Sequence, residues 1–168
     1  MTLLPASLGG DDGFIVWRLD DSRRAEGWDS GAGAHRIGGR WNSKGVRVVY
    51  CSVDAATAIL EVAVHRGLKG LDTVSHVITA AHISDFSSVH VVKPGVVPNA
   101  NWLRPGHPSA GQQAFGDNLL SRHRFVAIPS AVSKHSWNLI FDPRRGEGLY
   151  SLKLQEPFAL DTRLHPPS

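Results

Sequence analysis

Short β-rich runs separated by loops constrain this chain more than any other feature of its sequence. Seven runs rich in valine, isoleucine, phenylalanine, tyrosine and tryptophan predict strands. They cover residues 14–19, 47–51, 77–83, 89–92, 125–128, 137–141 and 149–154. Helical patterns are confined mainly to a buried helix, capped by Ser52 or Asp54 and ending near Arg66, and to residues 110–122. Many short strands with few helices predict a mixed α+β domain rather than a doubly wound one.

The length of 168 residues suits one globular domain. We expect that domain to cover residues 13–165, with a loose leader at residues 1–12 and a frayed tail after Leu164. No apolar run is long enough to span a membrane and no secretory signal pattern is present, so the expected compartment is the cytoplasm. The single cysteine, Cys51, excludes an internal disulfide and is expected to be a small apolar core residue.

The formal net charge of +3 suits an anionic ligand or an acidic partner. The basic residues are scattered and form no block of five or six, so the charge does not specify nucleic acid.

Glu61 is the acid in the middle of an otherwise apolar helical stretch, AILEVAVH. A carboxylate is rarely buried without a partner, because its desolvation is costly. Thr57 and His65 lie four residues away on the same helix face, so a narrow polar stripe could line a pocket. A solvent-exposed stripe, or a structural pair between Glu61 and an arginine, explains the pattern equally well.

Glycines surround a basic loop between Arg36 and Gly45, RIGGRWNSKG. The high glycine content of residues 20–45 predicts irregular structure there. Guanidinium groups and glycine backbone N–H groups match phosphate oxygens, so a pyrophosphate would be a natural ligand. The alternative is a basic surface turn that Trp41 anchors in the core.

Two further residues are weaker candidates. Tyr50 ends a predicted strand just before the Glu61 helix, where its ring could stack on a heterocycle and its hydroxyl could meet a polar partner. Ser130 places a hydroxyl at the end of another predicted strand. Both residues have ordinary structural explanations, in the core and in a turn.

Several familiar motifs are missing from the sequence. The stretch 31–36, GAGAHR, lacks the third glycine of a dinucleotide fingerprint, and no loop ends in the Gly-Lys-Ser/Thr of a P-loop. No His-Glu-x-x-His is present, so we predict no metal. The nucleophile elbow around a serine is missing as well.

Taken together, the motifs resemble the RES family of bacterial toxins. The matching segments are residues 16–18 (VWR), 31–45 (GAGAHRIGGRWNSKG), 48–50 (VVY), 58–65 (AILEVAVH), 116–117 (GD), 128–132 (IPSAV), 137–143 (WNLIFDP) and 157–164 (PFALDTRL). Their order and spacing agree from about residue 14 to residue 164. Phe141 and Asp142 stand where relatives often carry Leu-Asn, a departure that we expect to leave the chemistry unaffected.

The resemblance implies an α+β fold similar to the ADP-ribosyltransferase toxins, a split β-sandwich with flanking helices that binds NAD in a cleft. By motif match, the catalytic set is Arg40, Tyr50, Glu61 and Ser130. Arg18 and Asn138 match weaker positions, and the residues expected to bind NAD are Arg18, Arg40, Tyr50, Ser130 and Asn138. NAD is then the substrate, and no further cofactor is expected.

The activity that the resemblance implies is cleavage of the nicotinamide–ribose bond of NAD by hydrolysis or phosphorolysis, which arrests growth. A cognate Xre-like antitoxin is expected to block the site in a hetero-oligomer. One alternative is a mono-ADP-ribosyltransferase that modifies a cellular protein, although Ile59 stands where such enzymes often carry a second acid or amide. A basic nucleic-acid-binding domain that uses Trp41, Trp102 and the arginines is a rival from another class, and a purely binding relative is a third possibility.

Overall fold

A computed structural model describes residues 14–104 and 106–164 of the chain. The strands are β1 (Phe14–Asp21), β2 (Val49–Ser52), β3 (His76–Ile83), β4 (Val89–Val91), β5 (Phe125–Pro129), β6 (Trp137–Phe141) and β7 (Tyr150–Phe158). The helices are α1 (Ala32–Ile37), α2 (Ala55–Thr73), α3 (Ala110–Arg122) and α4 (Pro143–Gly146). Short 3₁₀ turns cover Ser22–Arg24, Phe86–Ser88, Pro94–Val96 and Thr162–Leu164. The predicted leader and the predicted tail both lie outside the described residues.

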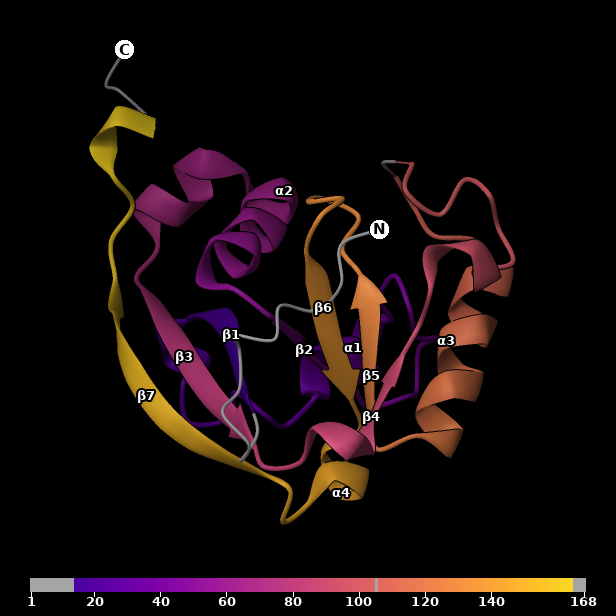
Figure 1. The fold of residues 1–168 in the computed structure, drawn as a ribbon. Coiled ribbons are helices and arrows are strands. Elements are labelled where there is room, and N and C mark those ends of the chain that lie inside the picture. Colours follow the sequence, from indigo (N-terminus) through magenta and orange to yellow (C-terminus); the bar gives the residue numbers. More distant parts are fainter. Residues whose placement is uncertain (1–13, 105, 165–168) are drawn as a thin grey trace.

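The seven strands form a mixed sheet in the order β4-β5-β6-β2-β1-β3-β7. Neighbouring strands are antiparallel except β4 and β5, which are parallel. Within the described residues, β1 and β2 pair at a single position, Trp17 opposite Ser52, whereas β1 and β3 pair along their whole length. The sheet is therefore divided into two halves that diverge after this junction (Figure 1).

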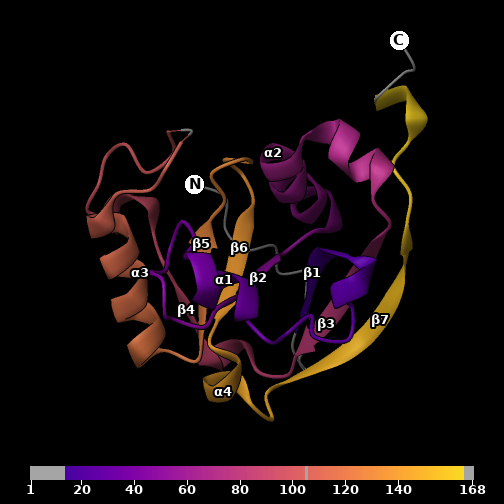
Figure 2. The same ribbon diagram turned by 180° about the vertical axis from the view of Figure 1, so that it is seen from behind.

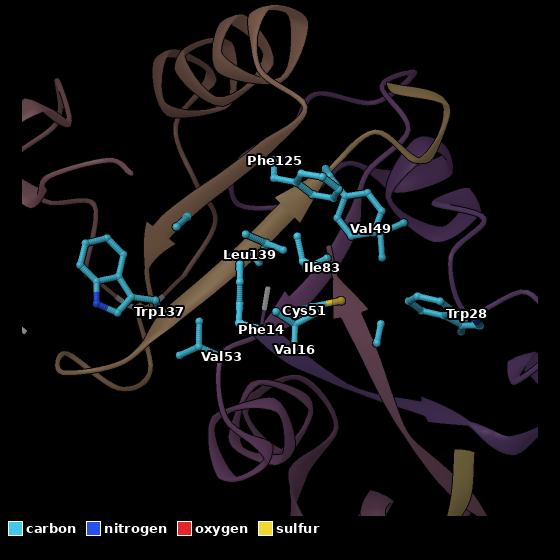
Figure 3. Packing of buried hydrophobic residues seen from close by; sticks show 13 residues of the cluster. Phe14, Val16, Trp28, Val49, Cys51, Val53, Ile83, Phe125, Trp137 and Leu139 are labelled. Carbon is cyan, nitrogen blue, oxygen red and sulfur yellow. The ribbon is translucent and has the colours of Figure 1, made fainter. Parts of the chain in front are cut away.

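The two halves pack their inner faces against each other. Side chains alternate between the faces of a strand, and the residues that point inward from both halves share one core cluster. Figure 3 shows Val16 and Ile83 from one half beside Cys51 and Leu139 from the other. This arrangement confirms the predicted α+β fold with a split, sandwich-like sheet.

Helix α3 lies against the outer face of the half that contains β5 and β6 (Figure 2). A second core cluster joins α3 to these two strands. Val126, Ile128 and Ile140 belong to this cluster, while their strand neighbours point into the inner core. Helix α2 contacts both β1 and β2 and so lies across the junction between the halves. A carboxylate on α2 is thereby placed where the sheet divides.

Helix α2 begins where the sequence indicated, because Asp54 accepts a hydrogen bond from the Thr57 amide as its N-cap. Gly67 has φ 73° and ψ 159°, which interrupts the helix one residue after the predicted end at Arg66. The prediction that this helix is buried is wrong. Its apolar residues Leu60, Val64 and Leu68 are 42%, 62% and 39% exposed, because the sheet covers only the opposite face of the helix.

The prediction of irregular structure throughout residues 20–45 is also wrong. Residues Ala32–Ile37 form helix α1, which starts after Gly31 at φ 62° and ends at Gly38 at φ 79°. The glycines therefore delimit a short helix instead of preventing one, since they supply left-handed backbone that other residues disfavour. No helix in the described part of the chain is long and apolar enough to cross a membrane.

Candidate active site

Glu61 lies on α2 and is held by one side chain from β6 and one from the loop that follows β5. Ser130 Oγ donates a hydrogen bond of 3.1 Å to Glu61 Oε1, and Asn138 Nδ2 donates one of 2.6 Å to the same oxygen. No described residue donates a hydrogen bond to Oε2. Within the described residues, the carboxylate is therefore fixed through Oε1 alone.

The strand register explains why these groups meet. Ser52 lies opposite Asn138, and Asn138 lies opposite Ile128, two residues before Ser130. Because side chains two residues apart share a face, Tyr50 and Ser52 on β2 point the same way as Asn138 on β6. This face, with Ser130 just beyond it, is the one that α3 covers, so the polar site forms at the edge of the second core cluster.

Ser130 is fully buried and is the first residue of the loop between β5 and β6. Its Oγ accepts hydrogen bonds from the backbone N–H groups of Val132 and Ser133, at 3.2 and 3.1 Å. Its own backbone N–H donates to the carbonyl of Ser136 at 3.0 Å. The hydroxyl proton of Ser130 is therefore directed at Glu61, because its lone pairs are occupied by the loop.

The far end of the same loop is fastened to the start of α2. Ser136 Oγ donates to Asp54 Oδ2, and Thr57 Oγ1 is hydrogen-bonded to both Asp54 and Ser136. Burial by itself would raise the pKa of Asp54, but the hydrogen bonds from Ser136 and Thr57 hold it below its ordinary value. Thr57 is thus buried in a structural cluster, and the polar stripe predicted through Thr57, Glu61 and His65 is divided between separate environments.

Tyr50 joins the glycine-bounded loop to the sheet. Its hydroxyl accepts a hydrogen bond from the backbone N–H of Trp41 at 3.1 Å and donates one to Asn42 Oδ1 at 2.7 Å. A Cβ atom on Gly39 would lie 2.7 Å from this hydroxyl, so a glycine is required for the close approach. The hydroxyl does find polar partners, as the sequence suggested, and they belong to the protein itself.

Charges from both sides of the site act on Tyr50. Burial raises the pKa of Tyr50 well above its ordinary value. The negative charges of Asp117 and Glu61 raise this pKa further. The hydrogen bond from the Trp41 backbone N–H and the positive charge of Arg40 lower it in part. The phenol is therefore neutral at physiological pH, and it stands within the electrostatic reach of both Arg40 and Glu61.

Arg40 is half-buried, and its Nη1 donates to the carbonyl of Trp102 at 2.8 Å. Trp41 and Trp102 are both buried and pack against each other, with ring centroids 5.8 Å apart. Neither ring is exposed to stack on a nucleobase, so the nucleic-acid alternative loses the contribution expected from the two tryptophans. Trp41 anchors the loop in the core, as the structural explanation of this motif required.

Helix α3 contacts the loop that carries Arg40, residues 39–43 (the Arg40 loop), at three points. Gln113 Nε2 donates to the Gly39 carbonyl, and Asp117 Oδ1 accepts from the Ser43 N–H. Between them, Gly116 lies so close that a Cβ atom there would be 1.9 Å from the Trp41 carbonyl oxygen. The Gly116-Asp117 motif therefore has a physical role in positioning this loop.

Arg18 occupies a different environment from the other predicted site residues. Its guanidinium forms a two-pronged pair with Asp20, with both N–O distances 2.6 Å, and donates to the Tyr50 carbonyl at 2.8 Å. It shares a strand face with Val16, which points into the inner core. The structure thus gives Arg18 a structural bond between β1 and β2, and its contact with NAD stays a prediction.

The structure brings Glu61, Ser130 and Asn138 into direct contact and connects Tyr50 to the Arg40 loop. Sequence reasoning missed Ser52, whose Oγ donates to Asn138 Oδ1 at 2.8 Å. It considered this residue only as a helix cap, and no sequence signal reveals the strand register that aligns it with Asn138.

Cys51 is buried in the inner core, as predicted, and burial raises the pKa of its thiol to about 12. Among the described residues, no group of three histidine, cysteine, aspartate or glutamate side chains could hold a metal ion.

The fold and the site define an α+β protein with a divided sheet and a hydrogen-bonded carboxylate where the halves separate. The RES domain matches residues 15–161, and the chain belongs to the RES domain family.

Two relatives illustrate the similarity. The Prs ADP-ribosylating toxin of Sphingobium sp. is 33% identical over 135 residues, 76% of this chain and 81% of that protein. The toxin Res of Yersinia enterocolitica is 30% identical over 155 residues, 90% of this chain and 99% of that protein. Among solved structures, a chain of the M. tuberculosis MbcT–MbcA toxin–antitoxin complex matches with a TM-score of 0.70 at 20% identity, covering 88% of this chain and 86% of that one.

Proposed function

We propose that this protein is the toxin of a bacterial toxin–antitoxin pair and that it cleaves the bond between nicotinamide and ribose in NAD. The observation that carries the proposal is the placement of Glu61, whose Oε1 is fixed by Ser130 and Asn138 while Oε2 accepts no hydrogen bond from a described residue. Relatives named as toxins support the biological part of the proposal.

One oriented carboxylate is sufficient for this reaction. The nicotinamide of NAD is cationic and leaves as a neutral molecule, so no general acid is needed. The ribose passes through an oxocarbenium-like state, and a preorganised negative charge stabilises it. In the proposed mechanism, Glu61 binds a ribose hydroxyl, stabilises the developing positive charge and orients the attacking nucleophile.

The bond changes balance with either small acceptor. A water oxygen, or a phosphate oxygen, forms a bond to the anomeric carbon as the carbon–nitrogen bond breaks and its electron pair goes to nicotinamide. With water, one proton is released to solvent and the product is ADP-ribose. NAD is the substrate in this scheme, which requires no further cofactor and no metal.

The remaining residues are proposed to bind NAD. Arg40 is anchored through one N–H, so the rest of its guanidinium fork is suited to a pyrophosphate oxygen. The charges of Arg40 and Glu61 both act on Tyr50, and its ring is proposed to contact the nicotinamide end. Ser130 and Asn138 hold the carboxylate and are proposed to contribute polar groups for NAD binding. Arg18 donates a hydrogen bond to the Tyr50 carbonyl, and its own contact with NAD stays a prediction from the family motif.

A second candidate is the transfer of ADP-ribose to a cellular protein. The name of the Sphingobium relative, an ADP-ribosylating toxin, favours it. Against it, Ile59 packs in a hydrophobic cluster two residues before Glu61, so no polar group at that position can orient a protein acceptor.

We further propose that an antitoxin of the Xre type covers the site in a hetero-oligomer in the cytoplasm. The similarity to a chain of a solved toxin–antitoxin complex supports such a partner.

Product analysis distinguishes these reactions. Purified protein freed of any partner is incubated with NAD in phosphate buffer, in phosphate-free buffer and with a cell extract. We expect stoichiometric nicotinamide with either ADP-ribose or its phosphate adduct. ADP-ribose found only on protein would favour the second candidate, and unchanged NAD in all three conditions would overturn the proposed function.

A further inference from the structure

Ser52 lies at the end of β2, directly opposite Asn138 on β6. Its hydroxyl donates a hydrogen bond of 2.8 Å to Asn138 Oδ1, and Nδ2 of the same amide donates to Glu61 Oε1 at 2.6 Å. Ser52 and Asn138 are only 3% and 7% exposed. Side chains from β2, β6 and α2 therefore form a relay in which each donates a hydrogen bond to the next.

We propose that Ser52 is a positioning residue for Glu61 and that it acts through Asn138. A side-chain amide has one accepting end and one donating end. With the Ser52 hydroxyl donating to Oδ1, the NH₂ group is turned towards Glu61. This inference rests on the proposed function, because it concerns how the proposed catalytic carboxylate is held.

The buried setting makes the Ser52 hydroxyl consequential. Without it, Asn138 Oδ1 is a buried acceptor that has lost its donor, a costly state that the amide can relieve by rotating. Rotation takes Nδ2 away from Glu61 and leaves Ser130 as its hydrogen-bond donor among the described residues. The carboxylate then loses its fixed orientation, on which stabilisation of the transition state depends.

The effect should fall on turnover rather than on NAD binding. The Arg40 loop is held by Tyr50 and by α3, through contacts that do not involve Ser52. The backbone of Ser52 is fixed independently by its pairing with Trp17 and Asn138, so the strand does not require the hydroxyl. A variant without the hydroxyl should therefore fold and bind NAD.

The kinetic test compares Ser52→Ala, Asn138→Ala and the double variant by steady-state nicotinamide release. We expect Ser52→Ala to lower kcat by about tenfold and to change KM by less than about twofold, the scale of one charge-assisted hydrogen bond. In the double variant, Ser52→Ala should lower kcat by less than about twofold beyond the effect of Asn138→Ala alone, since the two residues act in series. Additive losses would overturn the proposal.

Matched variants separate the hydroxyl from general effects. Ser52→Thr keeps the hydroxyl and suits a strand, so it should restore most of the turnover. Ser84→Ala removes a hydroxyl that donates to the Leu149 carbonyl in an exposed position and should leave turnover unchanged. If Ser52→Ala fails to fold, Ser52→Cys keeps the shape of the side chain with a slightly larger atom and a much weaker donor, and it should show the same loss.

An NMR experiment tests the positioning without relying on activity. The side-chain NH₂ signals of Asn138 should be well resolved and exchange slowly in the wild-type protein, because one proton is donated to Glu61. In Ser52→Ala these signals should broaden and exchange at least about tenfold faster, as expected when a buried hydrogen bond is lost. Unchanged signals would contradict the proposal, even if the wild-type protein proved unable to cleave NAD.

Discussion

At the scale of single residues, the Tyr50 hydroxyl connects the sheet to the loop that carries Arg40. It bonds the Trp41 N–H and Asn42 Oδ1, and both of these residues are buried. The sequence suggested a polar partner for this hydroxyl but gave no reason to expect both partners in one loop. Through these two hydrogen bonds, Tyr50 holds in place the loop that carries Arg40, the proposed phosphate-binding residue.

Tyr50→Phe should therefore weaken the fold and the proposed NAD site together. Leaving a buried donor and a buried acceptor unpaired should lower the free energy of unfolding by about 1–3 kcal/mol. Urea denaturation measures this loss, and steady-state kinetics should show a raised KM for NAD. Tyr150→Phe removes the chain's other tyrosine hydroxyl from Asp29, and it should lower stability while leaving KM unchanged. Equal KM values in both variants would contradict an anchoring role for Tyr50.

At the scale of secondary-structure elements, α3 acts as a support for the Arg40 loop. Gln113, Gly116 and Asp117 lie on one face of the helix, three and four residues apart, and all three meet residues 39–43. The glycine permits backbone contact that no other residue allows at this position.

Gly116→Ala should be strongly destabilising, because the new Cβ would lie 1.9 Å from the Trp41 carbonyl oxygen. Overpacking of this kind costs about 1–3 kcal/mol, and the helix must also move away from the loop. Thermal unfolding should show the loss, and NAD should bind more weakly to the folded fraction. Gly111→Ala, in the open first turn of the same helix, should leave stability unchanged or slightly raised. Similar melting temperatures for the two variants would show that α3 does not pack as described.

The start of α2 should make stability depend on pH. The pKa of Asp54 is lower in the fold than its ordinary value, so its ionised form stabilises the protein. This contribution is complete above the unfolded pKa, at about 4. It is lost as the pH falls through the lower, folded value.

Asp54→Asn tests this dependence while preserving a residue that can cap the helix. The difference in unfolding free energy between the wild-type protein and the variant should be largest at pH 6–7. It should shrink as the solution is acidified towards pH 3. Urea titrations across this range provide the measurement. A difference that stays constant with pH would mean that the charge of Asp54 does not contribute.

At the scale of the whole molecule, the strands could be predicted because their alternating apolar residues are a local property. Phe125 and Val126, for example, are neighbours on β5 and pack in different core clusters, because their side chains point to opposite faces of the strand. The exposure of α2 could not be predicted, because an apolar composition does not reveal which face a sheet will cover. Helix α1 was missed since its flanking glycines resemble those of an irregular loop.

The candidate site was predicted in part for the same reason. Glu61 stood out locally, as an acid in an apolar helix, and family motifs added Arg40, Tyr50, Ser130 and Asn138. The contacts of Ser52 depend on the register between β2 and β6, which is a property of the assembled sheet. The inward anchoring of Arg18 by Asp20 likewise required the structure.

The most direct test of the account is the rate of nicotinamide release from NAD by purified wild-type protein and by Glu61→Gln, measured side by side after thermal unfolding shows both to be folded. The substitution keeps the size of the side chain and removes its negative charge. We expect the wild-type protein to release nicotinamide and the variant to release it at least about a hundredfold more slowly. This is the scale of a lost electrostatic contact in a transition state. Equal release by the two proteins would contradict the assignment of Glu61 as the catalytic carboxylate.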